Sequence, residues 1–166
     1  PYTQMLDTSR GIEWARWCVG GTTNVVLNCL DRHRDTPTWD RVYLVWEGED
    51  QRAQRSLTYR QFDAEVCRLA GALKELGVGQ GDRVGLYMPN LPETFIAFFA
   101  VMKIGAVVMP LFSGFGPQPL VARLNDGQPK VVLTVDGTWR RGAPGAMKSV
   151  LDEALASVPS VAHVLV

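Results

Sequence analysis

Apolar residues follow two patterns along most of the chain. Short runs of apolar and β-branched residues predict strands at 41–49, 56–59, 83–89, 106–112, 130–135 and 162–166. Between them, apolar residues recur every three or four positions and predict helices at 58–77, 90–105, 117–127 and 146–157. Strands that alternate with helices of this length are typical of βαβ units. The predicted fold class is therefore α/β, with a mostly parallel sheet, helices on both faces and right-handed crossovers.

Capping residues mark the N-terminal starts of two of these helices. Thr58 and Gln61 have the spacing of a capping box, and Asn90 and Glu93 have capping spacing too. The helix that follows Asn90 is apolar nearly all round and is predicted to be buried, with Phe98 and Phe99 in the core.

The first forty residues are predicted to form a helical extension, 1–40, ahead of an α/β subdomain at 41–166. Residues 10–21 suggest one short helix and residues 22–33 a second, capped by Thr22 or Thr23. The strands predicted at 41–49 and 56–59 are separated by a polar run, so they favour a small antiparallel pair near the N-terminus.

Composition excludes several classes of function. The chain has 166 residues, 46% hydrophobic and 20% charged, with a net charge of zero and no block of Lys or Arg. Neither nucleic acid nor a membrane surface is therefore an expected partner. The apolar stretch 95–109 is too short to cross a bilayer, and the first residues do not resemble a signal peptide, so we expect a cytoplasmic protein.

Cys18, Cys29 and Cys67 lack metal-like spacing and are predicted to be buried free thiols.

The run LFSGFGP at 111–117 is the first candidate ligand site. A phosphate loop of the Walker type needs a lysine at the following helix, but Pro117, Gln118 and Pro119 stand there, so this class is disfavoured. A dinucleotide fingerprint is incomplete as well. Because the run follows a predicted parallel strand, it should lie at the carboxyl edge of the sheet, where ligands bind. Gly114 and Gly116 would permit close approach of a ligand or a positive φ, and a plain strand–helix turn remains the alternative.

The run TWRRGAPG at 138–145 is the second candidate. It also follows a predicted parallel strand, and Arg140 and Arg141 could clamp an anionic group, although a solvated basic turn is the simpler interpretation. His33 and His163 have no neighbouring Ser or Cys nucleophile. From its residues alone, the chain predicts an anion site and no catalytic machinery.

The stretches NCLDRH (28–33), GDRVGLYMPN (81–90), LFSGFGP and VLTVDGTWRRG (132–142) together resemble the N-terminal region of AMP-forming acyl-CoA synthetases. Their order and spacing are most similar to the acetyl-CoA synthetase branch of the adenylate-forming superfamily. The resemblance implies a ligase that uses ATP and Mg²⁺ to turn a carboxylic acid into an acyl-adenylate, releases pyrophosphate, and transfers the acyl group to CoA.

The resemblance also implies which residues meet CoA. Phe112, Ser113 and Gly114 match the aromatic and two small residues that border the family's CoA channel, with Ser113 in place of the usual glycine. Arg140 matches the arginine at the nucleotide end of CoA. Ala143 stands where acetate-type members often carry another arginine, so Arg141 is the candidate to compensate. No catalytic or metal-binding residue is expected among these 166 residues.

Most of the family's catalytic parts are expected outside this sequence. The Ser/Thr/Gly-rich ATP loop, the acidic adenine motif and the catalytic lysine have no match here, and the chain stops on an apolar strand, VAHVLV. We therefore expect a piece of a longer enzyme, inactive by itself, whose partners are the remainder of that enzyme, ATP, CoA and a carboxylic acid. Homo-oligomerisation stays open. The alternatives are an adenylating enzyme that loads a carrier protein and a non-catalytic scaffold or interaction module.

Overall fold

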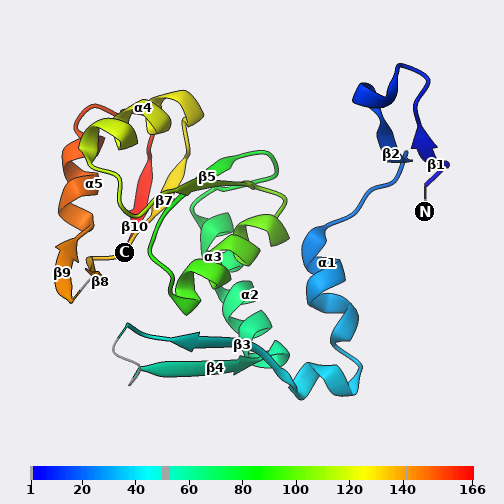
Figure 1. Cartoon of the computed structure of the whole chain (residues 1–166), viewed down its shortest axis with the longest axis horizontal. Coiled ribbons are helices and arrows are strands. Elements are labelled where there is room, and N and C mark those ends of the chain that lie inside the picture. Colours follow the sequence, from blue (N-terminus) through cyan, green and yellow to red (C-terminus); the bar gives the residue numbers. More distant parts are fainter. Residues whose placement is uncertain (1, 50–52, 141) are drawn as a thin grey trace.

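A four-stranded parallel sheet forms the centre of the protein (Figure 1). The structure is a computed structural model that describes residues 2–49, 53–140 and 142–166. The strand order is β10-β7-β5-β6, and every neighbouring pair in it is parallel. The strands are β5 (Arg83–Tyr87), β6 (Val107–Leu111), β7 (Val131–Leu133) and β10 (His163–Leu165). The predicted α/β class is confirmed.

Helices cover both faces of this sheet, as predicted (Figure 1). The pairs are α2 (Tyr59–Glu75) with α3 (Pro92–Lys103), and α4 (Pro117–Gly127) with α5 (Lys148–Leu155). Successive residues of a strand point to opposite faces. Accordingly, Leu86 packs with α2 and α3, whereas Tyr87 packs with α4 and α5. Gly85 faces the second side, where an added Cβ would lie 3.1 Å from a methyl group of Val132.

The start of α2 matches the sequence prediction and the start of α3 does not. Thr58 and Gln61 form the expected capping box, with the Gln61 side chain accepting from the Thr58 N–H at 2.9 Å. By contrast, Leu91 is the N-cap of α3 and provides no side-chain hydrogen bond. Glu93 pairs with Arg55 at 2.5 Å and is not part of a cap.

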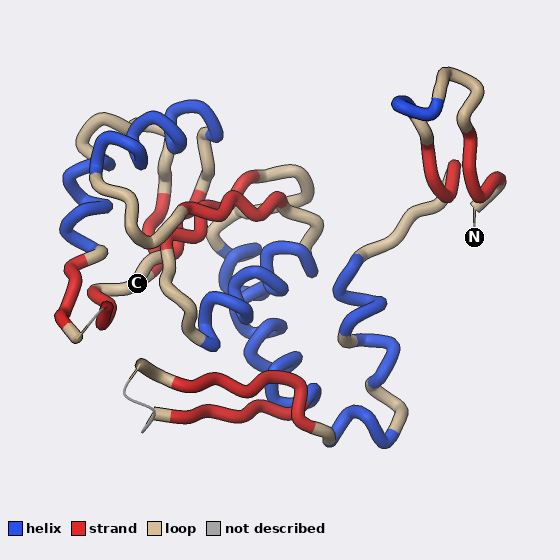
Figure 2. The backbone as a smooth tube through the Cα atoms, viewed as in Figure 1, coloured by secondary structure: helices blue, strands red, loops and turns tan. Residues whose placement is uncertain are grey.

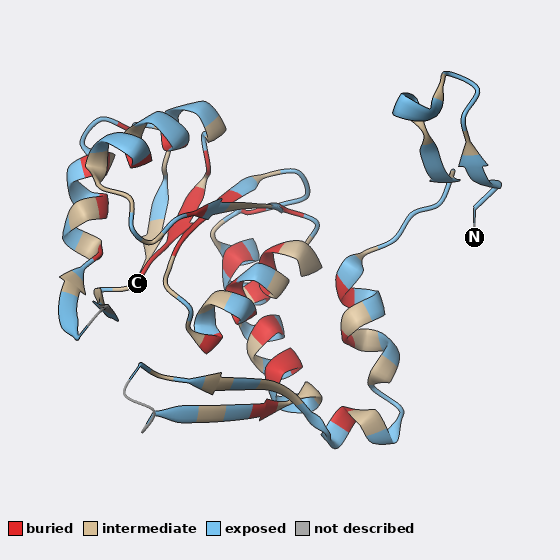
Figure 3. Ribbon diagram, viewed as in Figure 1, coloured by how far each residue is buried: buried red, intermediate tan, exposed pale blue. Residues whose placement is uncertain are grey.

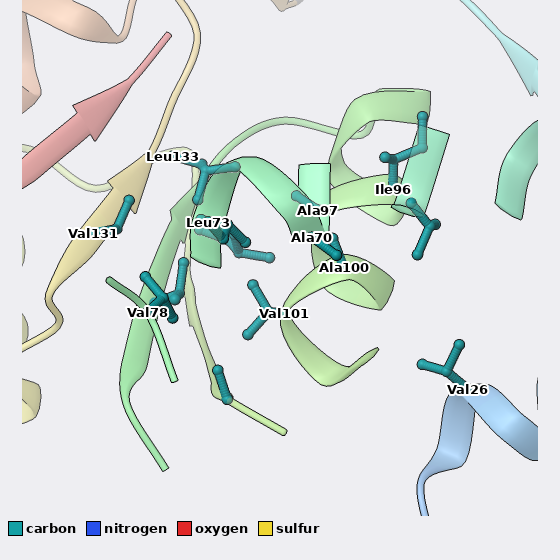
Figure 4. Packing of buried hydrophobic residues seen from close by; sticks show 14 of the residues in the cluster. Val26, Ala70, Leu73, Val78, Ile96, Ala97, Ala100, Val101, Val131 and Leu133 are labelled. Atoms are coloured by element: carbon teal, nitrogen blue, oxygen red, sulfur yellow. The ribbon is translucent and has the colours of Figure 1, made fainter. Parts of the chain in front are cut away.

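Helix α3 is buried on one side only. Figure 4 shows Ile96, Ala97, Ala100 and Val101 of this helix among the residues of α2 and β7. The opposite side reaches solvent, because Phe95 is 45% exposed and Phe98 is 39% exposed. The prediction of burial all round, with Phe98 in the core, is therefore wrong: the sheet and α2 cover only one side of the helix (Figure 3).

The first residues form a β-hairpin and not the helix predicted at 10–21. Strands β1 (Gln4–Asp7) and β2 (Arg16–Val19) pair antiparallel, and a short 3₁₀ helix, η1 (Ile12–Trp14), lies between them. Positive φ values at Gly11 and Cys18 are incompatible with a continuous helix. The hairpin lies apart from the body of the protein (Figure 2).

Helix α1 (Val25–Cys29) confirms the second N-terminal helix but not its cap. Asn24 is the N-cap, and its side chain accepts a hydrogen bond from the Val26 N–H at 2.9 Å. The same side chain donates to the carbonyl oxygen of Met102 at 2.8 Å, which ties α1 to the end of α3. Val26 belongs to the main core cluster, and the division of the chain at residue 40 stays a prediction.

The remaining elements are short. The small antiparallel pair is confirmed as β3 (Val42–Glu47) and β4 (Gln54–Thr58). Two 3₁₀ helices, η2 (Asp31–His33) and η3 (Pro37–Asp40), link α1 to β3.

The cysteines are free, but Cys18 and Cys67 are exposed and Cys29 is half-buried. Their predicted burial is wrong, because Cys18 lies in the projecting hairpin and Cys67, one helical turn after Asp63 on α2, is left exposed beside Arg34.

An ion-pair network fastens the N-terminal segment to the core. Lys103, at the end of α3, lies 3.0 Å from a carboxylate oxygen of Asp31 and 3.0 Å from one of Asp63. Arg34 contacts the same two carboxylates, at 3.1 and 2.8 Å. Although burial opposes it, hydrogen bonding to Asp31 and Asp63 raises the pKa of Lys103. The amine therefore stays charged at neutral pH and joins three segments that are distant in sequence.

Lys103→Met should lower the free energy of unfolding by about 1 kcal/mol, because it removes a charged partner while Arg34 still contacts both carboxylates. Lys74→Met, at an exposed lysine of α2, is the matched control and should change it much less. Urea denaturation of both variants gives the comparison. Equal effects of the two substitutions would show that the network contributes nothing to stability.

Candidate functional site

The carboxyl ends of β5, β6 and β7 meet at one edge of the sheet, because the strands are parallel. The loop after β6 begins at Phe112, and the segment after β7 leads into β8 (Gly137–Arg140). The two candidate runs predicted from the sequence therefore leave the same edge, which is where ligands bind in open α/β sheets.

The loop after β6 is a tight turn with exposed small residues. The Phe115 N–H donates to the carbonyl oxygen of Phe112 at 2.9 Å, which closes the turn around Ser113 and Gly114. Phe112 is 56% exposed, Gly114 is exposed and Ser113 is half-buried. Gly116 has an extended backbone with φ −82, and a Cβ there would meet open space, so a positive φ is not the reason for this glycine.

Three contacts hold Phe115 in this loop. The Tyr87 hydroxyl donates a hydrogen bond to the Phe115 carbonyl oxygen at 2.8 Å. The rings of Phe112 and Phe115 meet edge to face with centroids 5.5 Å apart. The guanidinium of Arg123 lies 4.2 Å from the centroid of the Phe115 ring, a cation–π contact. The loop is thus anchored from the sheet below and from α4 beside it.

The run at 138–145 forms a second hairpin, where a loop was expected. Strand β8 pairs antiparallel with β9 (Ala143–Ala146), and Gly142 provides a positive φ of 74 in the turn. Arg140 is the last residue of β8, and Arg141 lies outside the described residues. The Gly142 N–H donates to a Glu49 carboxylate oxygen at 3.3 Å, which links this hairpin to the end of β3.

A cleft of about 900 Å³ lies between the ends of β3 and β4, the β8–β9 hairpin and the loop after β5. Among the described residues, its lining is Trp46–Glu49, Ala53, Pro89–Leu91, Gly137–Trp139 and Gly142. The indole N–H of Trp46 donates to the Asn90 carbonyl oxygen at 2.7 Å and joins β3 to the sheet edge. The cleft thus includes the hairpin that carries Arg140 but not the loop at Phe112, so the two predicted groups of site residues lie on different parts of the edge.

Sequence reasoning missed the contribution of β3 to this cleft. Trp46 and Glu49 stand at the end of a strand that was interpreted only as half of an antiparallel pair. The available signal was the run WEGE, in which an aromatic and carboxylates precede a polar turn.

A smaller groove of about 460 Å³ lies on the α2–α3 side of the edge, lined in part by Met88, Leu133 and Leu165.

The described residues contain neither a cluster of metal ligands nor a membrane-spanning helix. Within residues 2–49, 53–140 and 142–166, three or more His, Cys, Asp or Glu residues nowhere gather into a group that could hold a metal ion. None of the helices described there is long and apolar enough to cross a membrane.

Comparison with known proteins identifies both a matching family and a set of similar curated proteins. The family described as AMP-binding enzyme matches residues 30–166. An acetyl-coenzyme A synthetase of Mycolicibacterium smegmatis is 45% identical over 100% of this chain and 18% of its own length. One from Mycobacterium tuberculosis is 46% identical over 100% of this chain and 26% of its length, and one from Streptomyces coelicolor is 46% identical over 99% and 25%. The chain thus spans about a fifth to a quarter of these curated relatives.

Proposed function

The chain belongs to the AMP-binding enzyme family, and from that premise we propose that it forms the N-terminal part of an acyl-CoA synthetase. The enzyme would activate a carboxylic acid with ATP, release pyrophosphate, and transfer the acyl group from the adenylate to CoA. The observation that carries this proposal is the 45–46% identity to acetyl-coenzyme A synthetases across nearly the whole chain. Acetate is the acid that these relatives' names favour.

The residues of this chain are proposed to serve the second half-reaction. Phe112, Ser113 and Gly114 would border the path of the pantetheine arm, and the exposure of Phe112 and Gly114 at the carboxyl edge of the sheet supports this role. Arg140 and Arg141 would contact the phosphates of CoA, for which a guanidinium is a suitable partner. Arg140 is the last residue of β8, the strand whose residues Gly137–Trp139 line the cleft, and this supports the role.

ATP and Mg²⁺ would be bound by other parts of the enzyme. We assign the residues of this chain no part in adenylation, because the family's ATP loop and catalytic lysine have no match in this sequence. What this chain contributes is positioning, since a thioester forms only when the CoA thiol is held against the acyl carbonyl.

The test uses the complete protein that carries this sequence, assayed with acetate. Acid-dependent ATP–pyrophosphate exchange would support adenylation, and CoA-dependent release of acetyl-CoA would support the acceptor. Exchange with no transfer to CoA, but with transfer to a phosphopantetheine carrier protein, would identify a carrier-loading enzyme instead. Absence of both reactions across a series of short and branched acids would reject the proposal.

The 166 residues alone should show no acid-dependent ATP–pyrophosphate exchange, because they contain no match to the family's ATP loop. The complete protein, assayed beside them at the same molar concentration, is the positive control. Exchange by the purified short chain would show that the residues for adenylation lie within this sequence after all.

A further inference from the structure

Tyr87 is a buried tyrosine whose hydroxyl binds the backbone of the loop after β6. It ends β5, its side chain is 1% exposed, and its ring packs in the cluster beneath α4 and α5. A buried hydroxyl requires a partner, and Tyr87 donates to the Phe115 carbonyl oxygen at 2.8 Å. Burial raises the pKa of Tyr87, so the phenol keeps its proton and remains a donor.

Phe115 in turn sets the position of the residues before it. Its N–H donates to the Phe112 carbonyl oxygen at 2.9 Å, and its ring meets that of Phe112 edge to face. Ser113 and Gly114 lie between Phe112 and Phe115 in the turn that these contacts close. Moving the Phe115 carbonyl would therefore move the whole turn that presents Phe112, Ser113 and Gly114 at the sheet edge.

We propose that Tyr87 is a positioning residue for CoA, acting through the Phe115 carbonyl to hold the turn 112–115 in its binding conformation. This inference rests on the proposed function, because it requires that CoA pass along this turn. A loop that is ordered beforehand loses less conformational entropy when its ligand binds, so losing the hydroxyl should weaken CoA binding specifically. Tyr87 itself is buried beneath the turn.

The experiment is Tyr87→Phe in the complete protein, which removes the hydroxyl and keeps the ring that packs in the core. The KM for CoA should rise about fivefold, which corresponds to about 1 kcal/mol, the usual contribution of one such hydrogen bond. The kcat at saturating CoA and the ATP–pyrophosphate exchange rate should stay within about twofold of the parent, because neither depends on ground-state binding of CoA. A general loss of structure would lower all of these rates together.

Two further variants make the result specific. Tyr43→Phe removes a hydroxyl from a tyrosine of β3 that packs against Tyr59 and Phe62, in the core cluster on the α2–α3 side, and should leave the KM for CoA unchanged. Arg123→Ala removes the cation–π contact on Phe115 from an exposed side chain, so it should not unfold the protein. It should raise the KM for CoA in the same selective way as Tyr87→Phe, by about two- to threefold.

The outcomes separate this inference from the function on which it rests. If the parent makes no acyl-CoA, the proposed function fails. If the parent makes acyl-CoA but Tyr87→Phe and Arg123→Ala both leave the KM for CoA unchanged, the positioning role is overturned while the function stands. A parallel fall in exchange and thioester formation in Tyr87→Phe also overturns it, because the hydroxyl would then serve only the fold. If Tyr87→Phe does not fold, Arg123→Ala decides alone.

Discussion

Phe62→Ala should lower the free energy of unfolding by about 3–5 kcal/mol, the usual cost of emptying a fully buried phenylalanine site. The Phe62 side chain is 0% exposed and lies at the centre of an aromatic group. Its ring centroid is 4.8 Å from that of Tyr43 and 5.4 Å from that of Phe99. These rings come from β3, α2 and α3, so the cavity would open where three elements meet.

The measurement is urea denaturation of the complete protein, with Phe98→Ala as the matched control. Phe98 lies on the same helix as Phe99 but is 39% exposed, so its truncation leaves no enclosed cavity and should cost much less. If Phe62→Ala and Phe98→Ala lower stability equally, the aromatic group is not the centre of the core.

Gly114→Leu and Arg140→Ala should each reduce acyl-CoA formation at sub-saturating CoA by at least about tenfold, while pyrophosphate exchange stays near the parent level. A leucine side chain at Gly114 would obstruct the pantetheine arm. In the proposed CoA-binding role, loss of Arg140 would remove a charge-assisted contact to a CoA phosphate, worth about 1.5–3 kcal/mol. In the proposed reaction, adenylation precedes the use of CoA, so neither residue is expected to serve it.

Both half-reactions must be assayed on the same preparations, and Gly116→Ala is the control for the loop. Gly116 lies two residues further on, with an ordinary backbone conformation and open space around its Cα, so an added methyl group should change little. If exchange and thioester formation fall together in Gly114→Leu, the glycine serves the turn alone.

Hydrophobic periodicity predicted the sheet and its helices because apolar and polar positions are clearly separated in these segments. The runs at β5, β6 and β7 are almost wholly apolar, and α2 separates a buried row containing Phe62, Val66 and Leu73 from charged residues. The two missed hairpins lack this contrast. Arg16–Val19 and Gly137–Arg140 mix tryptophan, arginine and small residues, and their backbones are fixed by turns at positive φ that side-chain pattern does not reveal.

The site was predictable only in part, for a related reason. Strand–loop–helix order placed the loop at Phe112 and the segment at Arg140 on one edge. Their separation, and the cleft beside Trp46, depend on how distant segments pack, which one-dimensional spacing does not encode. The same holds for Tyr87, which the sequence shows only as an apolar strand residue and which the fold brings beneath Phe115.

The strand order β10-β7-β5-β6 also bears on how the protein is made. Synthesis delivers β5 first, and the sheet then grows outwards from it, by β6 on one side and by β7 and β10 on the other. Until Val131–Leu133 leaves the ribosome, one edge of β5 has no partner strand in this sheet. An unpaired edge is a template for wrong pairing, so slow translation between β6 and β7 would prolong a stage at which this edge of β5 is open to other strands.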